Sequence, residues 1–173
     1  GIPFLVAGPD IPAGQTRNAP TCTEDLLPTT LGLAGLPAPD DLPGLDLSPY
    51  LRDPAARVPR DAVFCRQVEE LRQTSPKLIR VPWRAVRTER YLFAALSREP
   101  WMLFDHDTDP YETNNLVAAP SHRELRDHFA RRLEEHLRVT GDEFDFQAEP
   151  ATWRTDEEPR WPIPWAGDFT QKP

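Results

Sequence analysis

Three carboxylates alternate along one short, turn-rich segment, at Asp105, Asp107 and Asp109. Alternating acidic residues of this kind open the calcium-binding loop of EF-hand proteins. That loop also requires glycine at its sixth position and glutamate at its twelfth, and these positions hold Pro110 and Leu116. The pattern therefore excludes an EF-hand, and we expect the three carboxylates to accept hydrogen bonds from backbone N–H groups of the turn.

The four histidines, His106, His122, His128 and His136, do not form a metal-ligand pattern. Two histidines that bind one metal ion from a single helix usually stand four residues apart. His128 and His136 fall in the same predicted helix but lie more than two turns apart, so they cannot share an ion. We expect both side chains to lie on a solvated helix face.

Cys22 and Cys65 are the two cysteines of the chain. Two cysteines support neither a disulfide scaffold nor a zinc site, and a disulfide between them stays open. Cys22 lies near a predicted helix start, which favours a thiolate, but the neighbouring Glu24 and Asp25 oppose one. We therefore interpret both cysteines as buried structural thiols.

The common catalytic motifs are missing from the sequence. It contains no nucleotide-binding glycine-rich loop, no Gly-x-Ser-x-Gly and no His-Glu-x-x-His. Paired carboxylates occur only inside charge runs, such as residues 134–135 and 157–158. The residues alone therefore predict no catalytic residue and no metal site in this chain.

Composition narrows the classes of protein further. The chain has 173 residues, with 28 acidic and 20 basic side chains and a formal net charge of −8. This balance argues against a nucleic-acid binder, and the apolar runs are too short for a membrane span. The 21 prolines predict many extended or turned connections. The opening at Gly1 has no signal-peptide pattern and favours a cut within a longer protein, so the compartment stays open.

The first part of the chain predicts half of an α/β layer unit. The apolar residues 3–7 are typical of a strand buried on both faces, as in a parallel sheet. Thr23 and Asp25 are good helix N-cap residues, and a leucine-rich helix is expected to run from there to Gly35. No partner strands for residues 3–7 are visible in this chain, which makes the unit a remnant of a larger sheet.

Prolines then interrupt the chain as far as about residue 81, which predicts a long ordered connection. Within it, residues 62–71 are expected to form a brief helix with Phe64, Val68 and Leu71 facing inward. The alternative, a disordered linker, agrees less well with the recurrence of leucine, tyrosine and phenylalanine.

A compact α+β region follows. Residues 84–88, 91–96 and 101–105 predict three short strands in an antiparallel meander. Ser121 and Glu124 are spaced as a capping box, and apolar residues recur every four positions from there to Gly141, which predicts one packed helix. The proline-rich tail after residue 146 carries three tryptophans, which either pack back on the domain or form an interaction surface.

Four segments resemble the sulfatase family, in the family's order. They are residues 3–14 (PFLVAGPDIPAG), 23–35 (TEDLLPTTLGLAG), 83–91 (WRAVRTERY) and 103–116 (LFDHDTDPYETNNL). The resemblance implies a sulfatase of the alkaline-phosphatase-like superfamily, which hydrolyses sulfate esters. In that family a formylglycine made from Cys or Ser in a Cys/Ser-x-Pro-x-Arg motif is the nucleophile, and a calcium ion holds the sulfate.

The chain departs from the family where catalysis is concerned. Neither Cys22 nor Cys65 lies in the formylglycine motif, and the family's paired-Asp metal motif is absent. The family's Asp-Gly-Arg-Ser-Leu turn reads Pro-Gly-Leu-Asp-Leu at residues 43–47. The resemblance therefore carries over no catalytic residue and no cofactor, and it places the calcium and formylglycine in the full-length family enzyme.

The resemblance implies the C-terminal portion of a sulfatase. We expect residues 1–50 to end the α/β catalytic domain, 51–82 to connect, 83–146 to form a C-terminal subdomain of antiparallel sheet and helix, and 147–173 to form the tail. The expected partner is the missing N-terminal catalytic portion, with self-association through an exposed apolar face also open.

Trp83, Arg84 and Arg87 are candidates for the substrate-pocket rim, because a guanidinium suits sulfate. The alternative for the arginines is a solvated strand face. For the whole chain, the alternative to a sulfatase portion is a stand-alone, non-catalytic interaction module derived from one.

Overall fold

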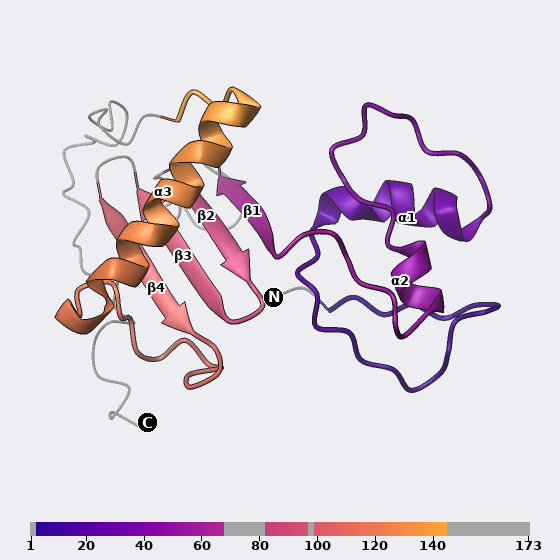
Figure 1. Ribbon diagram of the computed structural model, residues 1–173, viewed down its shortest axis with the longest axis horizontal. Coiled ribbons are helices and arrows are strands. Elements are labelled where there is room, and N and C mark those ends of the chain that lie inside the picture. The colour runs from indigo at the N-terminus through magenta and orange to yellow at the C-terminus, as the bar shows by residue number, and fades with distance from the viewer. Residues whose placement is uncertain (1–2, 68–81, 97–98, 145–173) are drawn as a thin grey trace, which may run out of the picture.

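The computed structural model describes residues 3–67, 82–96 and 99–144. They form two lobes that lie side by side in Figure 1. The amino-terminal lobe (residues 3–60) holds the 3-10 turn η1 (Thr23–Asp25) and the helices α1 (Leu26–Leu33) and α2 (Ser48–Arg52). The sheet lobe (the described residues from 62 to 144) holds four strands and the helix α3 (Arg123–Thr140). In the described part of the chain, no helix is both long and apolar enough to cross a membrane.

The sheet is an antiparallel meander, with its strands in the order β1-β2-β3-β4. The strands are β1 (Ala62–Gln67), β2 (Trp83–Thr88), β3 (Tyr91–Leu96) and β4 (Pro100–Asp105). The three strands predicted from the sequence are confirmed, with β2 and β4 each beginning one residue earlier. The predicted α+β arrangement of this region is therefore confirmed.

The helix predicted over residues 62–71 is wrong, because Ala62–Gln67 form β1. This strand pairs with β2 along its whole length, from Ala62 opposite Thr88 to Gln67 opposite Trp83. Neighbouring strand edges that offer six residues of pairing override the weak local preference for helix. Phe64 packs beside the core from this strand, whereas Val68 and Leu71 lie outside the described residues.

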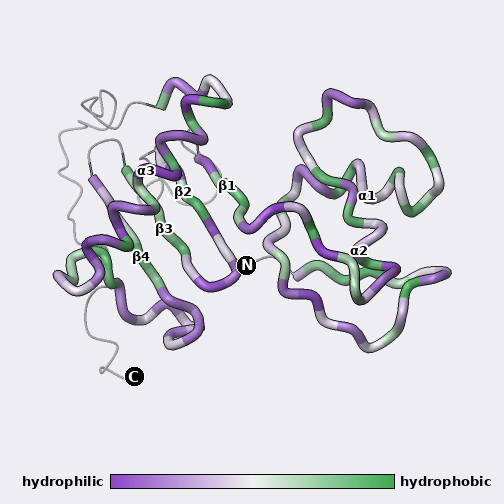
Figure 2. Tube along the Cα trace, in the orientation of Figure 1, coloured by the Kyte–Doolittle hydropathy of each residue, from purple (hydrophilic) through white to green (hydrophobic). Residues whose placement is uncertain are grey.

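The helix α3 covers one face of the sheet (Figure 1). Every second residue of the strands faces it, so that Val86, Phe93 and Leu103 are fully buried. From α3, Phe129 and Leu133 pack against them at a helical spacing. Along α3, Figure 2 shows hydrophilic stretches interrupted by hydrophobic ones, as expected of a helix with one buried stripe.

The two ends of α3 are built differently from each other. The predicted capping box is wrong: Pro120–His122 form the 3-10 turn η2, and Ser121 Oγ bonds His122 Nδ1 rather than a backbone N–H. At the other end, Gly141 has a φ of 65°, and its N–H donates to Leu137 O. A left-handed glycine satisfies the last carbonyls at little steric cost, which is why the helix ends where predicted.

The strand predicted over residues 3–7 is wrong, because these residues form no strand and Leu5 is 88% exposed. A strand buried on both faces needs neighbouring strands to accept its hydrogen bonds, and the described sheet does not include this segment. The helix predicted up to Gly35 is confirmed as η1 followed by α1, with Gly35 at a φ of 70°.

Polar groups hold the amino-terminal lobe together. Asp25 is 1% exposed and accepts hydrogen bonds from the backbone N–H groups of Cys22 and Leu45, each at 2.9 Å. Thr29 Oγ1, also buried on α1, accepts from Leu47 N at 2.9 Å. Residues 45–47 are therefore tied to α1 through polar side chains and their own backbone.

Gly44 lies where the chain next to residues 45–47 approaches the backbone of Glu24 most closely. A Cβ atom at position 44 would stand 1.9 Å from Glu24 O, which is backbone and cannot move aside. Only glycine allows the two chain segments to approach this closely.

Candidate functional site

The three rim candidates lie on β2, but they have different surroundings. Trp83 Nε1 donates to Gln67 Oε1 at 2.7 Å, across the β1–β2 pair. Arg84 is 6% exposed and binds Asp142 with two hydrogen bonds, of 2.7 and 2.8 Å, beneath the ring of Phe144. Arg84 therefore does not lie on a solvated strand face, and its guanidinium is already occupied by a carboxylate.

Arg87 differs from the arginines of this fold that pair with a carboxylate. A carboxylate is often bound through two donors of an arginine, because the planar guanidinium matches it. Arg60 with Asp25 and Arg84 with Asp142 are such pairs, and the exposed Arg90 binds Asp105 in the same way. Among the residues that the structure describes, Arg87 has no carboxylate at ion-pair distance.

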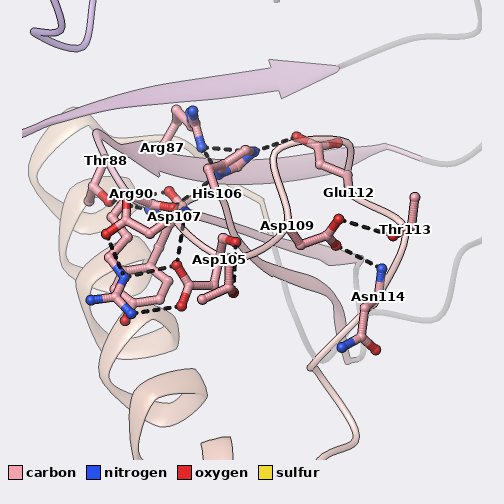
Figure 3. Close-up of polar contacts among 12 residues, drawn as sticks. Arg87, Thr88, Arg90, Asp105, His106, Asp107, Asp109, Glu112, Thr113 and Asn114 are labelled. Carbon is pink, nitrogen blue, oxygen red and sulfur yellow. Dashed lines mark hydrogen bonds and ion pairs between the residues drawn. The ribbon is translucent and has the colours of Figure 1, made fainter.

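Arg87 contacts the imidazole of His106 instead (Figure 3). Both ring nitrogens lie near Arg87 Nη1, and His106 Nε2 also lies 2.7 Å from Glu112 Oε1. A carboxylate accepts only, so Nε2–H of the ring donates to Glu112. His106 Nδ1 lies between two groups, the Arg87 guanidinium and the backbone carbonyl of Arg90, which is 3.0 Å away.

The sheet register explains why these residues meet. Arg87 stands opposite Leu92, and Leu92 stands opposite Phe104, in one row across β2, β3 and β4. Since neighbouring residues of a strand alternate between faces, this row lies on the face away from α3. His106 follows Phe104 by two residues and continues the same face beyond the end of β4.

Arg87 keeps donors that could bind an anion. Its Nη1 is directed at His106, whereas no hydrogen bond in the described part of the chain engages its Nε or Nη2. The side chain is half-buried, and this burial lowers the pKa of Arg87, while the charge of Glu112 opposes the shift. A partly desolvated guanidinium with a free pair of donors is suited to an oxyanion such as sulfate or carboxylate.

The loop after β4 supports His106 and Glu112. Asp109 accepts from Asn114 N at 2.8 Å and from Thr113 Oγ1 at 3.0 Å, and these bonds lower the pKa of Asp109. Asp105 binds Arg90, and its pKa is lowered by that pair. The interpretation of these carboxylates as turn-stabilising groups is confirmed for Asp105 and Asp109.

The described residues contain no group of three or more His, Cys, Asp or Glu side chains that could hold a metal ion.

The two thiols do not form a nucleophilic site. Both are free, and burial, aided by the charge of Asp25, raises the pKa of Cys22. Cys65 is exposed, so the prediction of a buried thiol is wrong there. Its side chain lies on β1 next to Phe64, and strand alternation puts it on the face away from the core.

The histidines of α3 lie in different surroundings. His128 is exposed, as predicted. His136 is half-buried and stacks on Phe64 with 3.6 Å between ring centroids, so the solvated position predicted for it is wrong. The helix that carries His136 was predicted, but strand β1 was not, and β1 supplies the ring of Phe64 that covers His136.

The sequence comparison decides the family. A sequence model described as "N-sulphoglucosamine sulphohydrolase, C-terminal" matches residues 1–139. The chain belongs to this sulfatase family. It is 37% identical over 145 residues to an ulvan-active sulfatase of Formosa agariphila, which covers 83% of the chain and 28% of that protein. The predicted sulfatase resemblance is confirmed.

Two further relatives agree with the family. A Δ4,5-hexuronate-2-O-sulfatase of Bacteroides thetaiotaomicron is 28% identical over 149 residues, covering 83% of the chain and 30% of that protein. The solved structure of a 2-O GAG sulfatase matches with a TM-score of 0.66 at 26% identity, covering 79% of the chain and 29% of that structure. The chain thus spans less than a third of the sulfatases it matches, in a region that the family model describes as C-terminal.

Sequence reasoning selected Arg87 but missed His106 and Glu112 as its neighbours. The signal was present in the strand pattern, since residues 87, 92, 104 and 106 share a face once the meander is drawn in register. The position of Glu112 depends on a loop with a left-handed residue, φ 57° at Glu112 itself, which no periodicity indicates.

Proposed function

We propose that this chain is the C-terminal portion of a sulfatase that hydrolyses sulfate esters, and that it supplies scaffold and part of the substrate-pocket rim. Family membership and the short share of each relative that it spans support the proposal. The nucleophile and the metal site belong to the N-terminal catalytic portion in this proposal, and formylglycine and calcium are the groups expected there.

The observation that carries the proposal is the outward orientation of the α1 leucines. The residues of α1 that are buried are Pro28 and Thr29, whereas Leu26 and Leu27 are 45% and 55% exposed. Leu36, just after the helix, is 56% exposed. We call Leu26, Leu27 and Leu36 the leucine patch. A helix that turns polar groups inward and leucines outward is built to be covered by another apolar surface.

The catalytic portion is the proposed cover for the leucine patch. The chain covers only 28% of the ulvan-active sulfatase, so most of the length of that relative has no counterpart in this chain. The apolar residues 3–7 lie beside this region in sequence and form no strand by themselves, as expected for a strand whose partners belong to another part of the protein.

The proposed substrate class is a sulfated saccharide. The relatives are an ulvan-active sulfatase, a hexuronate-2-O-sulfatase and an N-acetylglucosamine-6-O-sulfatase, so sulfated saccharides recur among them. An acidic saccharide also suits a rim that carries an arginine without a carboxylate partner.

A complementation experiment tests this function. The F. agariphila sulfatase is truncated to remove the part that this chain matches, and is produced in a host that installs formylglycine, with and without the 173-residue chain. We expect the truncated enzyme to be inactive alone and to regain sulfate-ester hydrolysis when the chain is present, because the chain completes its sheet and covers its apolar surface.

Matched variants show whether the leucine patch makes the contact. The double variant L26Q/L27Q should lower the restored activity at least about tenfold, because each leucine loses its burial in the complex. The control is V139Q, which removes an equally exposed apolar side chain from α3, 68% exposed, and should leave the activity unchanged. Activity that is not restored, or restored equally by L26Q/L27Q, would contradict the proposed function.

The second candidate is a stand-alone, non-catalytic interaction module. The same leucine patch favours it, together with the absence of the formylglycine motif from the sequence. This candidate predicts that the leucine patches of two copies of the chain pack against each other. Sedimentation of the chain should then show a dimer that L26Q/L27Q dissociates and that the truncated sulfatase does not compete away. Dissociation by the truncated sulfatase favours the sulfatase portion instead.

A further inference from the structure

We propose that Arg87, held in place by His106 and Glu112, binds an oxyanion of the saccharide other than the sulfate that is hydrolysed. The inference rests on the proposed function and names the group of the substrate that this lobe recognises. The ligand class is a carboxylate or a second sulfate carried by the sugar chain.

The contrast with Arg84 on the same strand supports this assignment. Both arginines are at least half-buried. Arg84 donates from its two edges to Asp142 and to the carbonyls of Trp83 and Gln67. Arg87 has only its Nη1 engaged within the described residues, and this nitrogen contacts the imidazole of His106 and no carboxylate. Arg87 has no carboxylate in direct contact among the described residues, and the charge of Glu112 acts on it only through the His106 ring and space, so an external oxyanion gains more there than at an exposed arginine.

His106 and Glu112 act as positioning residues. Glu112 Oε1 accepts from His106 Nε2, and Arg90 O lies 3.0 Å from His106 Nδ1, so the ring is held at both nitrogens while it contacts one edge of the Arg87 guanidinium. The opposite edge, Nε and Nη2, is then presented as a planar pair of donors, which matches the two oxygens of a carboxylate or sulfate. His106 lies between Glu112 and Arg87 in this network. Glu112 therefore holds the imidazole ring without occupying the N–H donors of Arg87.

The hydrolysed sulfate is not the ligand proposed for Arg87. That sulfate must lie at the nucleophile and metal, and the described residues provide no metal-ligand group and no activated thiol. The role proposed for Arg87 is therefore to recognise another anionic group of the saccharide, as a determinant of specificity rather than of bond cleavage.

The first test is independent of catalysis. NMR spectra of arginine Nε–H groups are recorded for the full 173-residue chain with glucuronate, glucose 6-sulfate and, as an uncharged control, glucose, all at low ionic strength. We expect the Arg87 signal to shift with both anions and not with glucose. The carboxylate of glucuronate and the sulfate of glucose 6-sulfate each offer a pair of oxygens to the guanidinium. Equal shifts at the exposed Arg131 of α3, or no shift at Arg87, would overturn the inference.

The second test uses the restored sulfatase from the complementation experiment. R87Q should raise the KM for a saccharide with a second anionic group by about tenfold, with kcat nearly unchanged, and leave a substrate with one sulfate and no other charge unaffected. R87K should recover part of the loss, because it keeps the charge but not the fork. The matched control, R131Q, should change neither constant.

H106Q and E112Q test the positioning residues. Each should raise the same KM by about threefold and broaden the Arg87 Nε–H signal, because the guanidinium loses its fixed edge. The free energy of unfolding serves as the check on structure. If R87Q instead lowers activity equally for charged and uncharged substrates, Arg87 forms an ion pair with the catalytic portion, and the inference is wrong while the proposed function stands.

Discussion

The two lobes of the chain bury different kinds of side chain. In the sheet lobe, α3 and the meander enclose apolar residues such as Phe93, Leu103 and Leu133, all of which are at most 1% exposed. In the amino-terminal lobe, the most deeply buried groups are Asp25, Thr29, Leu47 and Ser48, and two leucines of α1, Leu26 and Leu27, are exposed. A lobe with an apolar core can fold alone, whereas a lobe joined by polar groups requires a second surface for its apolar side chains.

The largest effect is expected from removing apolar core in the sheet lobe. Phe93→Ala should lower the free energy of unfolding by about 3–5 kcal/mol, because it leaves a cavity at a fully buried position. Urea denaturation followed by far-UV circular dichroism measures the change. The matched variant L27A in the amino-terminal lobe should change it by less than about 0.5 kcal/mol in the isolated chain. Comparable losses from both variants would show that α1 is covered in the isolated chain.

The next effect is expected from the polar centre of the amino-terminal lobe. Asp25→Asn removes the charge that pairs with Arg60 and should cost about 2–4 kcal/mol, because Arg60 is left half-buried without its anion. Hydrogen exchange should show lost protection in α1 and residues 45–47, while β2 and β3 keep theirs. Loss of protection in both lobes together would mean that they unfold as one cooperative unit.

The smallest effect is expected from lowering the pH, which should open the amino-terminal lobe before the sheet lobe. The pKa of Asp25 is lowered by its hydrogen bonds from Arg60, Cys22 and Leu45, which outweigh the opposing effect of burial. A carboxyl with a lowered folded pKa contributes stability that is present above its unfolded pKa, about 3.9, and is lost as the pH falls through the folded value. The amino-terminal lobe, which lacks an apolar core, should therefore open first below about pH 4.

The sheet lobe provides the comparison for this acid transition. The pKa of Asp142 is also lowered, chiefly by the hydrogen bonds from Arg84, but apolar packing supports the same lobe. Hydrogen exchange between pH 5 and pH 2.5 should show α1 exchanging before α3. D142N should reduce the pH dependence of hydrogen exchange in the sheet lobe. E143Q, which changes the neighbouring exposed residue, should leave that pH dependence as it is. Simultaneous opening of α1 and α3 would contradict the ordering.

Much of the sheet lobe could be predicted from the sequence. Residues 91–96 carry aromatic and branched apolar side chains beside short turns, and β3 has those bounds. The apolar residues of α3 recur every four positions, and its end at Gly141 is set by local backbone chemistry. These signals depend on neighbours in sequence, so a single sequence contains them.

The secondary-structure predictions that were wrong concern segments whose pairing partners lie far away in sequence. Residues 62–67 become a strand because β2 lies beside them, and residues 3–7 do not become one because the described sheet gives them no neighbour. The candidate site depends on such partners too, since Arg87 and His106 come from different strands and Glu112 from a loop. The residue types suggested an arginine that suits sulfate, but only the register showed which arginine lacks a carboxylate.

The pair of Arg84 and Asp142 joins positions 58 residues apart. Protein chains emerge from the ribosome from their amino end, so β2 is complete long before Asp142 is available. Until then, the sheet would have to bury the Arg84 guanidinium without an anion, which is strongly unfavourable. We therefore expect the nascent sheet lobe to stay open until α3 and the residue after Gly141 have left the exit tunnel.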